Sequence, residues 1–432
     1  MFYQKEIEKM PRKKLEALQL ERLKWTVDYC IKNVPFYAEK LCSAGVTGNK
    51  IKSLDDIRNI PITTKDDLRD NYPIGLFAKP MKDIVRIHAS SGTTGKSTIV
   101  GYTKKDLDIW SDCVARICVA AGVSDEDIVQ ISIANCMQTG AMGFQYALEK
   151  IGATVIPNIN DNAEKTLMYM RDLGTTVLVS TPSLAMYLRE AANDLEYSRS
   201  KYKLRLGLFG SESCSNEMRT KIEKSWGLFA TDNYGVSELI GPGVSGECVH
   251  RNGLHFCEDY FYPEIIDTET LEVLDEGETG DLLVTTLAKE GIPLLRYRTR
   301  DITRLNYDVC ECGRTAVRMD KVKGRSDDMI KIRGVNVFPS QIESVLMDYE
   351  RIGGNYQLVL RTEAFIDTLE VKVELMDGRL LDSFGEVQKM QKNLGDKIQS
   401  TLGLKCKLSL VEPKSLERYA GKTLRILDLR NQ

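Results

Sequence analysis

The chain has 432 residues, enough for two or three domains with an ample core. Hydrophobic residues (42%) and charged residues (28%) occur in the proportions of an ordinary soluble protein. The formal net charge of −3 gives no sign of a nucleic-acid or membrane-surface partner, so we expect neither.

The N-terminal stretch and the cysteines bear on where the protein is located. The stretch MFYQKEIEKMPRKKLEALQLERL lacks the apolar core of a signal peptide. No apolar run approaches the ~18 residues needed to span a bilayer. Eleven widely spread cysteines are typical of reduced thiols in a cytoplasm. We therefore expect a soluble, cytoplasmic protein.

The predicted elements begin with a helix over the first 35 residues or so. Leu15, Leu18 and Leu23 recur there at helical spacing before VPFY ends the helix. Further along, the strands DIVQISIA, TTVLVST and KLRLGLFG alternate with helices such as NAEKTLMYMRDLG and SNEMRTKIEKSWG. This alternation indicates an α/β fold with largely parallel sheets. Polar turns in EIIDTETLEVLDEGETGDLLVTTL indicate antiparallel strands.

The pattern changes after KGRSDD to that of a small α+β unit. QIESVLMDY is predicted as a helix, and YQLVLRT and LEVKVEL are predicted as strands. We place a domain boundary near Asp327. The prediction is a large N-terminal α/β domain with mixed and parallel sheets (1–326) and a small, mobile α+β domain (327–432).

Residues 90–98, SSGTTGKST, carry the residue types of a phosphate-binding loop between two predicted strands. Glycines bring backbone N–H groups close to oxygens, hydroxyls donate hydrogen bonds and a lysine adds positive charge. These residues are Ser90, Ser91, Gly92, Thr93, Thr94, Gly95 and Lys96. A Walker A loop requires glycine at position 90, so a hydrolytic P-loop NTPase is excluded. The alternative is a plain surface turn.

Four later stretches carry side chains suited to the same kind of ligand. DNYGVSE ends in Glu238, a carboxylate suited to Mg²⁺ on a phosphate. YRTRD places Asp301 where an acid could accept ribose hydroxyls. KGRSDDMIKIRGVNVFP brings paired charges to the domain boundary, and RYAGKTLR contains Lys422. Taken singly, each is more often a solvated turn or a structural acid.

Together these motifs resemble those of the phenylacetate–CoA ligases, which are adenylate-forming acyl-CoA synthetases. The similarity runs nearly end to end, through VPFYAEKL, PITTKDDLRDNYP, SSGTTGKST, GATVIP, NYGVSELIGPGV, LLRYRTRDIT, GRSDDMIKIRGVNVFPSQIE and GKTLR. The resemblance implies that a carboxylate attacks the α-phosphorus of ATP, giving an acyl-AMP and pyrophosphate. The thiol of coenzyme A then displaces AMP.

The resemblance also implies roles for individual residues. Residues 90–96 would hold the β- and γ-phosphates, Glu238 would hold Mg²⁺ and Lys422 would bridge the substrate carboxylate and the α-phosphate. Asp327 would be the hinge on which the C-terminal domain turns so that coenzyme A can enter. The remaining nucleotide-binding residues would be Tyr234, stacked on adenine, Asp232, accepting from its amine, Asp301 on the ribose with Arg325 nearby, and Ser211, Glu212, Asn233 and Gly235.

The acyl pocket departs from the pattern of this family. Where relatives carry a ring-containing stretch like YGYGLFTGG, this chain reads IANCMQTGAMG, with Ile133 and Gln138 in place of rings. Gly210 would complete the pocket, and Ser213 and Cys214 replace a larger pair downstream. Losing rings removes stacking partners and adds polar groups that need hydrogen bonds. We therefore expect a more polar aryl acid, or a small acid, in preference to phenylacetate.

Two stretches, ECVHRNGLHFC and CECGR, hold cysteines and histidines of the kind that bind zinc. The candidates are Cys248, His250, His255, Cys257, Cys310 and Cys312. Many related ligases retain the equivalents of Cys248, His255, Cys310 and Cys312, so the resemblance favours these four as ligands of a structural zinc. The alternative is a group of reduced, unliganded cysteines.

The expected function is an ATP-dependent acid–thiol ligase that uses a small carboxylic acid, ATP, coenzyme A and Mg²⁺. One rival is an enzyme that passes its acyl group to a carrier-protein thiol. Another is a nucleotide-binding sensor without catalysis, which the presence of Lys422, Glu238 and Asp301 together argues against. The acid and the oligomeric state, including a homodimer, stay open.

Overall fold

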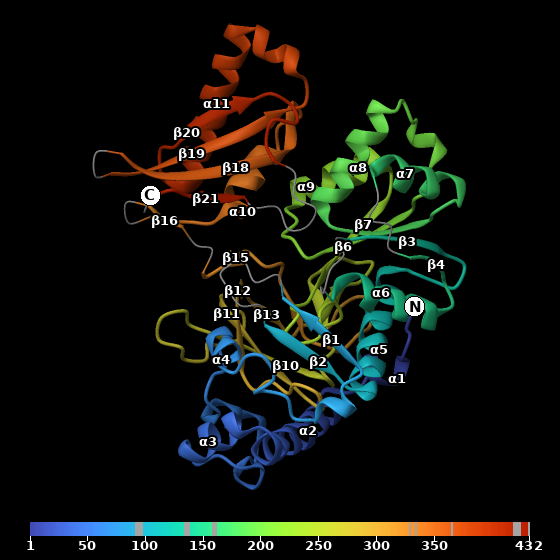
Figure 1. The fold of residues 1–432 in the computed structure, drawn as a ribbon, viewed down its shortest axis with the longest axis vertical. Coiled ribbons are helices and arrows are strands. Elements are labelled where there is room, and N and C mark those ends of the chain that lie inside the picture. Colours follow the sequence, from blue (N-terminus) through green and yellow to red (C-terminus); the bar gives the residue numbers. More distant parts are fainter. Residues whose placement is uncertain are drawn as a thin grey trace.

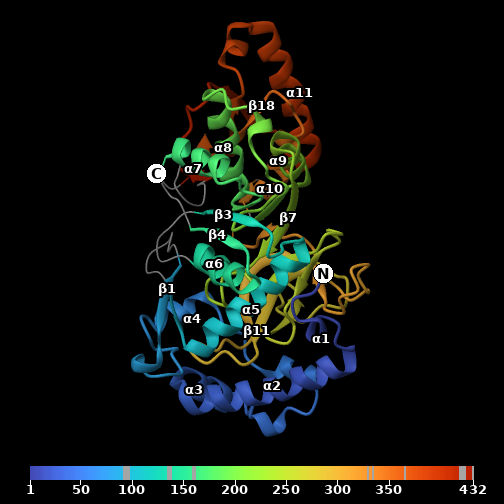
Figure 2. The same cartoon turned by 90° about the vertical axis from the view of Figure 1, so that its right-hand side faces the viewer.

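The computed structural model describes residues 1–90, 98–133, 139–157, 162–327, 330–332, 335–363, 366–417 and 425–430. Figures 1 and 2 show a large N-terminal part built around sheets and a smaller C-terminal part seated beside α9. Within the described ranges, no helix is both long enough and apolar enough to cross a membrane.

Helices at the N-terminus cover one end of the molecule (Figure 1). The predicted first helix is confirmed: α2 begins after Pro11 and ends at Asn33, and Pro35 then starts a new helix because proline is tolerated in the first turn. The helices in this region are α1 (Lys5–Glu8), α2 (Arg12–Asn33), α3 (Pro35–Ser43), η1 (Gly48–Lys50), η2 (Leu54–Asn59), α4 (Lys65–Asp70) and η3 (Met81–Asp83).

The main sheet has nine strands and changes character at β7. On one side β4, β3, β5, β6 and β7 are parallel, and the three inner strands β3, β5 and β6 are the buried, largely apolar ones that were predicted. On the other side β8, β9, β14 and β13 continue the sheet antiparallel. The strands are β3 (Ile128–Ser132), β4 (Thr154–Ile156), β5 (Val177–Ser180), β6 (Leu206–Gly210), β7 (Phe229–Tyr234), β8 (Ser245–Glu247), β9 (Leu254–Phe256), β13 (Leu305–Asn306) and β14 (Arg318–Met319).

Helices connect the parallel strands and cover the sheet, as the alternating sequence pattern predicts. Several begin at a capping side chain; Thr103, for example, accepts from the backbone N–H of Asp106 at the start of α5. The helices are α5 (Lys104–Ala121), α6 (Gly140–Ile151), α7 (Ala163–Asp172), α8 (Pro182–Asp194), η4 (Arg199–Lys201) and α9 (Asn216–Trp226).

Two smaller antiparallel units complete the N-terminal part. The hairpin of β1 (Arg86–Ala89) and β2 (Ile99–Tyr102) flanks the predicted phosphate loop, which confirms that this loop joins two strands. The second unit is a four-stranded sheet that includes the predicted antiparallel pair. Its strands, in spatial order, are β10 (Phe261–Ile266), β11 (Gly280–Thr286), β12 (Tyr297–Thr303) and β15 (Gly324–Arg325).

The C-terminal part is the predicted α+β unit. Its sheet has the order β20-β19-β18-β21, in which β18 and β19 are antiparallel and each has a parallel partner on its outer side. The elements are β16 (Ile330–Ile332), β17 (Val335–Val337), α10 (Pro339–Met347), β18 (Ile352–Glu363), β19 (Ile366–Leu375), η5 (Gly378–Asp382), α11 (Phe384–Leu402), β20 (Lys407–Val411) and β21 (Ile426–Asp428).

The two parts meet where α9 packs on α10, as both views show. Lys221 Nζ donates to the carbonyl oxygens of Tyr349 and Ile352, at 3.0 Å each. One turn earlier on the same helix, Glu217 accepts from the hydroxyl of Ser344 at 2.9 Å. One hydrophobic cluster contains side chains from α8, α9 and the C-terminal sheet, so the parts share core as well as polar contacts.

Candidate active site

The predicted phosphate loop is closed at its base by Ser90 and Thr98. The Ser90 backbone N–H donates to the Thr98 carbonyl oxygen at 3.0 Å, and the Thr98 N–H and hydroxyl contact Ser90 Oγ at 3.1 and 2.7 Å. The other predicted loop residues lie outside the described ranges; they are Ser91, Gly92, Thr93, Thr94, Gly95 and Lys96. The hairpin thus fixes where this loop starts and ends.

Glu238 lies directly against the base of that loop. Its side chain is buried, and its Oε1 accepts a hydrogen bond from Thr98 Oγ1 at 3.0 Å. Lys65 Nζ approaches the same oxygen at 3.7 Å. A carboxylate, two hydroxyls and a lysine therefore lie together at the base of the loop, and these groups are of the types that can bind phosphates and a divalent cation.

Sequence reasoning missed Lys65 and Thr98 as members of this site. Lys65 is the first residue of α4, where the Thr64 cap fixes the direction in which the helix starts. PITTKDDLRDNYP carried part of the family resemblance, and that was the available signal for Lys65. The contact itself could not be anticipated because positions 65, 98 and 238 are far apart in sequence.

Tyr234 and Asp301, both predicted to bind the nucleoside, contact each other. The Tyr234 hydroxyl donates to Asp301 Oδ2 at 2.6 Å, and burial with the nearby Asp301 charge raises the pKa of this phenol. The strand pairing of β12 with β15 sets Asp301 opposite Arg325, whose guanidinium lies 3.6 Å from Asp301 Oδ1. The structure thus brings together three of the predicted nucleotide-binding residues.

Arg325 also contacts the predicted hinge. Its guanidinium donates to both carboxylate oxygens of Asp327 at 2.8 and 2.9 Å. One arginine therefore lies between the acid predicted to bind ribose and the acid predicted to be the hinge. Lys422 lies outside the described residues.

Asp232 and Asn233 are at the carboxyl end of β7, beside the end of β6. Burial, reinforced by the charge of Glu247, raises the pKa of Asp232 to about 7. Asn233 Nδ2 donates to the Phe209 carbonyl oxygen.

Strands β6 and β7 approach each other so closely that a Cβ on Gly210 would lie 2.7 Å from the Asn233 carbonyl oxygen. Gly210 therefore has no room for a side chain.

The next turn holds Ser211, Glu212 and Gly235. Ser211 has a left-handed backbone, with φ of 67°, and is exposed. The Glu212 carboxylate accepts from the Ser183 N–H and hydroxyl at 3.2 and 2.8 Å, so in this structure it caps the start of α8. A Cβ on Gly235 would lie 1.7 Å from the Gly241 carbonyl oxygen, which explains the glycine.

The predicted acyl pocket is described only in part. Ile133 follows β3 directly, is 7% exposed and packs beside Gly140. Gln138 lies outside the described ranges. Ser213 is exposed, whereas Cys214 is buried next to the cap of α9. An aliphatic side chain therefore occupies the strand end at which an aromatic one was expected in relatives.

The four predicted metal ligands lie together. One ligand atom from each of Cys248, His255, Cys310 and Cys312 can be chosen so that all lie within 4.8 Å of one another. The Cys248 and Cys310 sulfurs are 3.8 Å apart, and Cys312 Sγ is 3.5 Å from His255 Nε2. A tetrahedral zinc with ordinary bond lengths requires edges of about 3.8 Å between sulfurs and about 3.5 Å from sulfur to nitrogen.

The other two candidate ligands are engaged elsewhere. His250 Nδ1 lies 3.2 Å from Glu311 Oε2, and the Cys257 thiol donates to the Cys113 carbonyl oxygen at 3.8 Å. Hydrogen bonds to Cys248 and to His255 lower the pKa of the Cys312 thiol, which favours its thiolate form.

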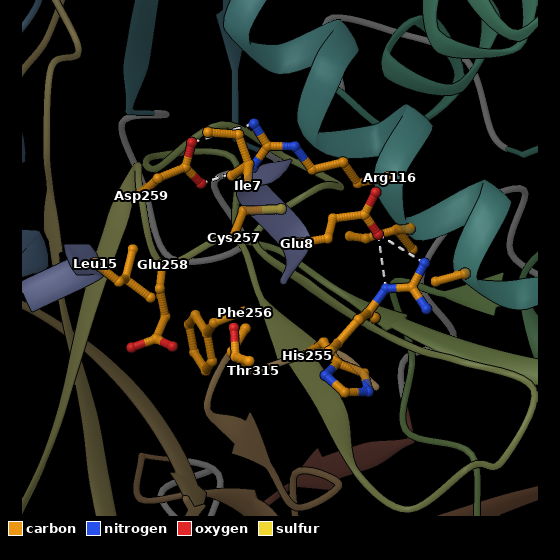
Figure 3. Close-up of a pocket in the computed structure, with 15 residues that line it drawn as sticks. Ile7, Glu8, Leu15, Arg116, His255, Phe256, Cys257, Glu258, Asp259 and Thr315 are labelled. Atoms are coloured by element: carbon orange, nitrogen blue, oxygen red, sulfur yellow. Dashed lines mark hydrogen bonds and ion pairs between the residues drawn. The ribbon is translucent and has the colours of Figure 1, made fainter. Parts of the chain in front are cut away.

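A small cavity next to the cysteine cluster is lined by charged groups that pair with each other (Figure 3). The Arg116 guanidinium donates a hydrogen bond to the Asp259 carboxylate, and the Arg314 guanidinium donates one to the Glu8 carboxylate of the N-terminal segment. His255 and Cys257, two of the candidate metal ligands, line it together with residues that were not predicted to bind the nucleotide, so this cavity is separate from the candidate nucleotide site.

The fold and these contacts define a class of AMP-binding, adenylate-forming enzymes. The chain matches the AMP-binding enzyme family over residues 39–287 and the AMP-binding enzyme C-terminal domain over residues 334–430. It resembles the crystal structure of 2-hydroxyisobutyryl-CoA ligase in the postadenylation state with an acyl-AMP. The TM-score is 0.92 at 25% identity, over 99% of this chain and 92% of that one.

Curated relatives show to which family of adenylate-forming enzymes the chain belongs. Phenylacetate-coenzyme A ligase from Escherichia coli (strain K12) is 44% identical, over 96% of this chain and 95% of the relative. The ligase of the same name from Thermus thermophilus is 41% identical over the full length of both. The chain therefore belongs to the phenylacetate–coenzyme A ligase family. It is an AMP-forming acid–thiol ligase that joins a carboxylic acid to coenzyme A through an acyl-adenylate, using ATP.

Proposed function

We propose that the acid is a polar aryl or a small carboxylic acid and that plain phenylacetate is a weaker substrate. The main support is that Ile133, an aliphatic side chain, is buried at the carboxyl end of β3. In the sequence it comes directly before the stretch that ends in Gln138. A phenyl group would lack a stacking partner there, and a buried Gln138 amide would need a hydrogen-bond partner from the acid or from water.

Phenylacetate itself is the rival substrate, because four curated relatives at 41–44% identity carry that name. A screen of carboxylic acids for ATP- and coenzyme A-dependent AMP release decides between them. The direct comparison is competition between phenylacetate and hydroxylated or heteroaryl acetic acids. We expect the polar acids to have the higher kcat/KM. A clear preference for unsubstituted phenylacetate would reject the proposed specificity.

For the first half-reaction we propose that Glu238, with the phosphate loop 90–96, binds the triphosphate together with Mg²⁺. The support is the meeting of Glu238, Thr98 and Lys65 at the loop base. Bound Mg²⁺ would reduce the negative charge that repels an incoming carboxylate. Lys422 would offset the charge that develops between the carboxylate and the α-phosphate.

For the nucleoside we propose Asp301 on the ribose hydroxyls, with Arg325 beside it, and Tyr234 against adenine. The Tyr234–Asp301 hydrogen bond supports a shared site for these side chains. Asp232 would accept from the adenine amine, and Asn233 would line the same strand end. The main-chain turns of Ser211, Glu212 and Gly235 would complete this surface.

For the second half-reaction we propose that the C-terminal domain turns about Asp327 so that coenzyme A can enter. The same 2-hydroxyisobutyryl-CoA ligase gives a TM-score of 0.74 in its thioesterification state with coenzyme A, against 0.92 in its postadenylation state. The present arrangement of the two domains thus supports the proposal that this conformer belongs to the first half-reaction. We propose that the boundary between the two domains lies between residues 326 and 327.

We also propose a structural zinc bound by Cys248, His255, Cys310 and Cys312. The support is the agreement between their spacings and a tetrahedral site.

The cysteines in the described part of the chain are free, which supports a reducing, cytoplasmic location. A homodimer stays a proposal, to be measured by sedimentation.

A further inference from the structure

Lys289 is a buried lysine that the reaction scheme above does not use. Lys289 is 6% exposed, and no carboxylate of the described residues lies within ion-pair distance of its Nζ. Burial lowers its pKa to about 8 against the opposing effect of the Asp106 and Glu238 charges. A buried ammonium group is costly unless hydrogen bonds compensate it, so its partners indicate its role.

The partners of Lys289 are main-chain carbonyls of the turn that carries Glu238. Its Nζ lies 3.0 Å from the Glu238 carbonyl oxygen and also donates to that of Leu239. In this turn the N–H groups of residues 239, 240 and 241 all donate to the Val236 carbonyl oxygen. As at a helix end, the carbonyls that follow lack partners within the turn and need donors from outside.

Tyr102 supports the same turn from a neighbouring strand. Its hydroxyl lies 3.5 Å from the Ser237 carbonyl oxygen and 3.3 Å from that of Ile240. Lys289 Nζ stands 5.2 Å from the centre of the Tyr102 ring. Lys289 and Tyr102 thus donate hydrogen bonds to the four successive carbonyl oxygens of residues 237–240, and the contacts from the lysine are the shorter ones.

The segment that holds Lys289 is itself fixed. The buried Asp106 carboxylate accepts from the N–H groups of Glu290 and Gly291 at 2.8 Å each. Ala288 has a left-handed backbone with φ of 92°, which is unfavourable for a residue other than glycine and persists only in a constrained setting. Lys289 is therefore a donor held in a set position.

We propose that Lys289 is a positioning residue for Glu238, fixing the turn from which its carboxylate reaches the phosphate loop. Thr98 fixes the carboxylate and Lys289 fixes the main chain of the same residue. The inference rests on the proposed role of Glu238 in holding Mg²⁺ with ATP.

The test compares Lys289→Met and Lys289→Gln with the wild-type enzyme. The rate of acyl-adenylate formation is measured with an ATP–pyrophosphate exchange assay. Free Mg²⁺ is varied while ATP and the acid are kept saturating. We expect the half-saturating Mg²⁺ concentration to rise about 10-fold or more in Lys289→Met, the scale for removing a residue that orients a metal ligand. Lys289→Gln retains a donor and should rise less.

Lys105→Met is the matched control, because it removes an exposed lysine that pairs with Glu290, next to Lys289. Its Mg²⁺ dependence should match the wild type. A Lys289→Met enzyme with a lower melting temperature and an unchanged Mg²⁺ dependence would show a merely structural lysine and overturn the proposal. If that variant does not fold, Lys289→Gln decides, and an unchanged Mg²⁺ dependence there has the same meaning.

Glu238→Gln separates the two proposals. If it leaves the Mg²⁺ dependence unchanged, the role of Glu238 fails and the inference about Lys289 fails with it. If it raises the half-saturating Mg²⁺ while both Lys289 variants do not, the inference alone fails. Because the lysine is proposed to act through Glu238, adding Lys289→Gln to Glu238→Gln should change the Mg²⁺ dependence less than about twofold.

Discussion

Lys221 donates a hydrogen bond from α9 to the main-chain oxygen of Tyr349, across the contact between the two parts of the chain, at 3.0 Å. A second bond to the Ile352 oxygen and the Glu217–Ser344 pair lie beside it. These contacts belong to the arrangement that resembles a postadenylation state. Rotation of the C-terminal domain would have to break them.

The first prediction concerns Lys221→Met. Losing two hydrogen bonds from a charged donor should disfavour the present arrangement and lower acyl-adenylate formation by about tenfold. Conversion of supplied acyl-AMP to the thioester should be spared. The measurement is the ratio of the two half-reaction rates, with Lys224→Met, an exposed lysine on the same helix, as control. Equal losses in both half-reactions would contradict a role for Lys221 in choosing between conformers.

The second prediction concerns Lys422, for which we propose a role in the first half-reaction because the GKTLR motif resembles that of the family. Lys422→Ala should reduce adenylate formation by at least about 100-fold, the scale for losing one preorganised charge partner. It should reduce thioester formation from supplied acyl-AMP far less. Lys405→Ala, on the exposed surface of the same domain, should leave both rates unchanged. The assignment does not survive if Lys422→Ala reduces both half-reactions alike.

The third prediction concerns the cysteine cluster. Protein purified without chelators should contain about one zinc per chain. Cys310→Ser combined with Cys312→Ser should release the metal and lower the melting temperature. Because Arg314 and Thr315 hold Glu8 and Met10, the N-terminal segment should also become sensitive to proteases. Cys42→Ser, at an exposed cysteine, is the control. Metal analysis that finds no zinc in the wild-type protein would dismiss the site.

The fourth prediction concerns the pH dependence of stability. The pKa of Asp232 is raised to about 7 in the folded state from an ordinary value of 3.8. The folded state therefore holds this proton more tightly than the unfolded state. The resulting stabilisation is complete below about pH 4 and is lost as the pH rises to about 7, by a few kcal/mol. Urea denaturation of the wild type and Asp232→Asn from pH 4 to 8 measures it. The two curves should converge or cross over this range; a constant difference would refute the shift.

The fifth prediction concerns the acyl pocket. Ile133→Tyr combined with Gln138→Phe should raise kcat/KM for phenylacetate relative to hydroxylated phenylacetates by about tenfold, the sum of two aromatic contacts. Each single variant should give part of the change. Competition assays measure the ratio directly. If the double variant leaves the ratio unchanged, these two positions do not face the acyl group.

Strands β3, β5 and β6 of the parallel half could be predicted because they are almost wholly buried and read as largely apolar runs. The antiparallel half could not. Strands β8 and β9 have three residues each, lie in a polar and glycine-containing stretch, and depend on partners far along the chain. No local pattern of period two is long enough to reveal them.

The same difference applies to the candidate site. Family motifs located Glu238, Tyr234 and Asp301, and the structure brings these motifs together. Lys65 and Lys289 were not predicted, because the roles proposed for them depend on where the fold places a side chain. Neither lies in a stretch whose composition suggests phosphate binding. For the four metal ligands, residue type and resemblance were enough to choose a set that the structure gathers.

The hydrophobic cluster shared by the two parts has a consequence for how the enzyme melts. Met186 of α8 and Met218 of α9 lie beside Gly354 of β18, and both side chains belong to or pack against the hydrophobic cluster that the two parts share. Because the two parts share this cluster, we expect them to unfold as a single cooperative unit in this arrangement. The proposed turn of the C-terminal domain would uncover those apolar faces and would divide this unit in two. We therefore expect the thermal stability of the enzyme to be higher in the present arrangement than after that turn.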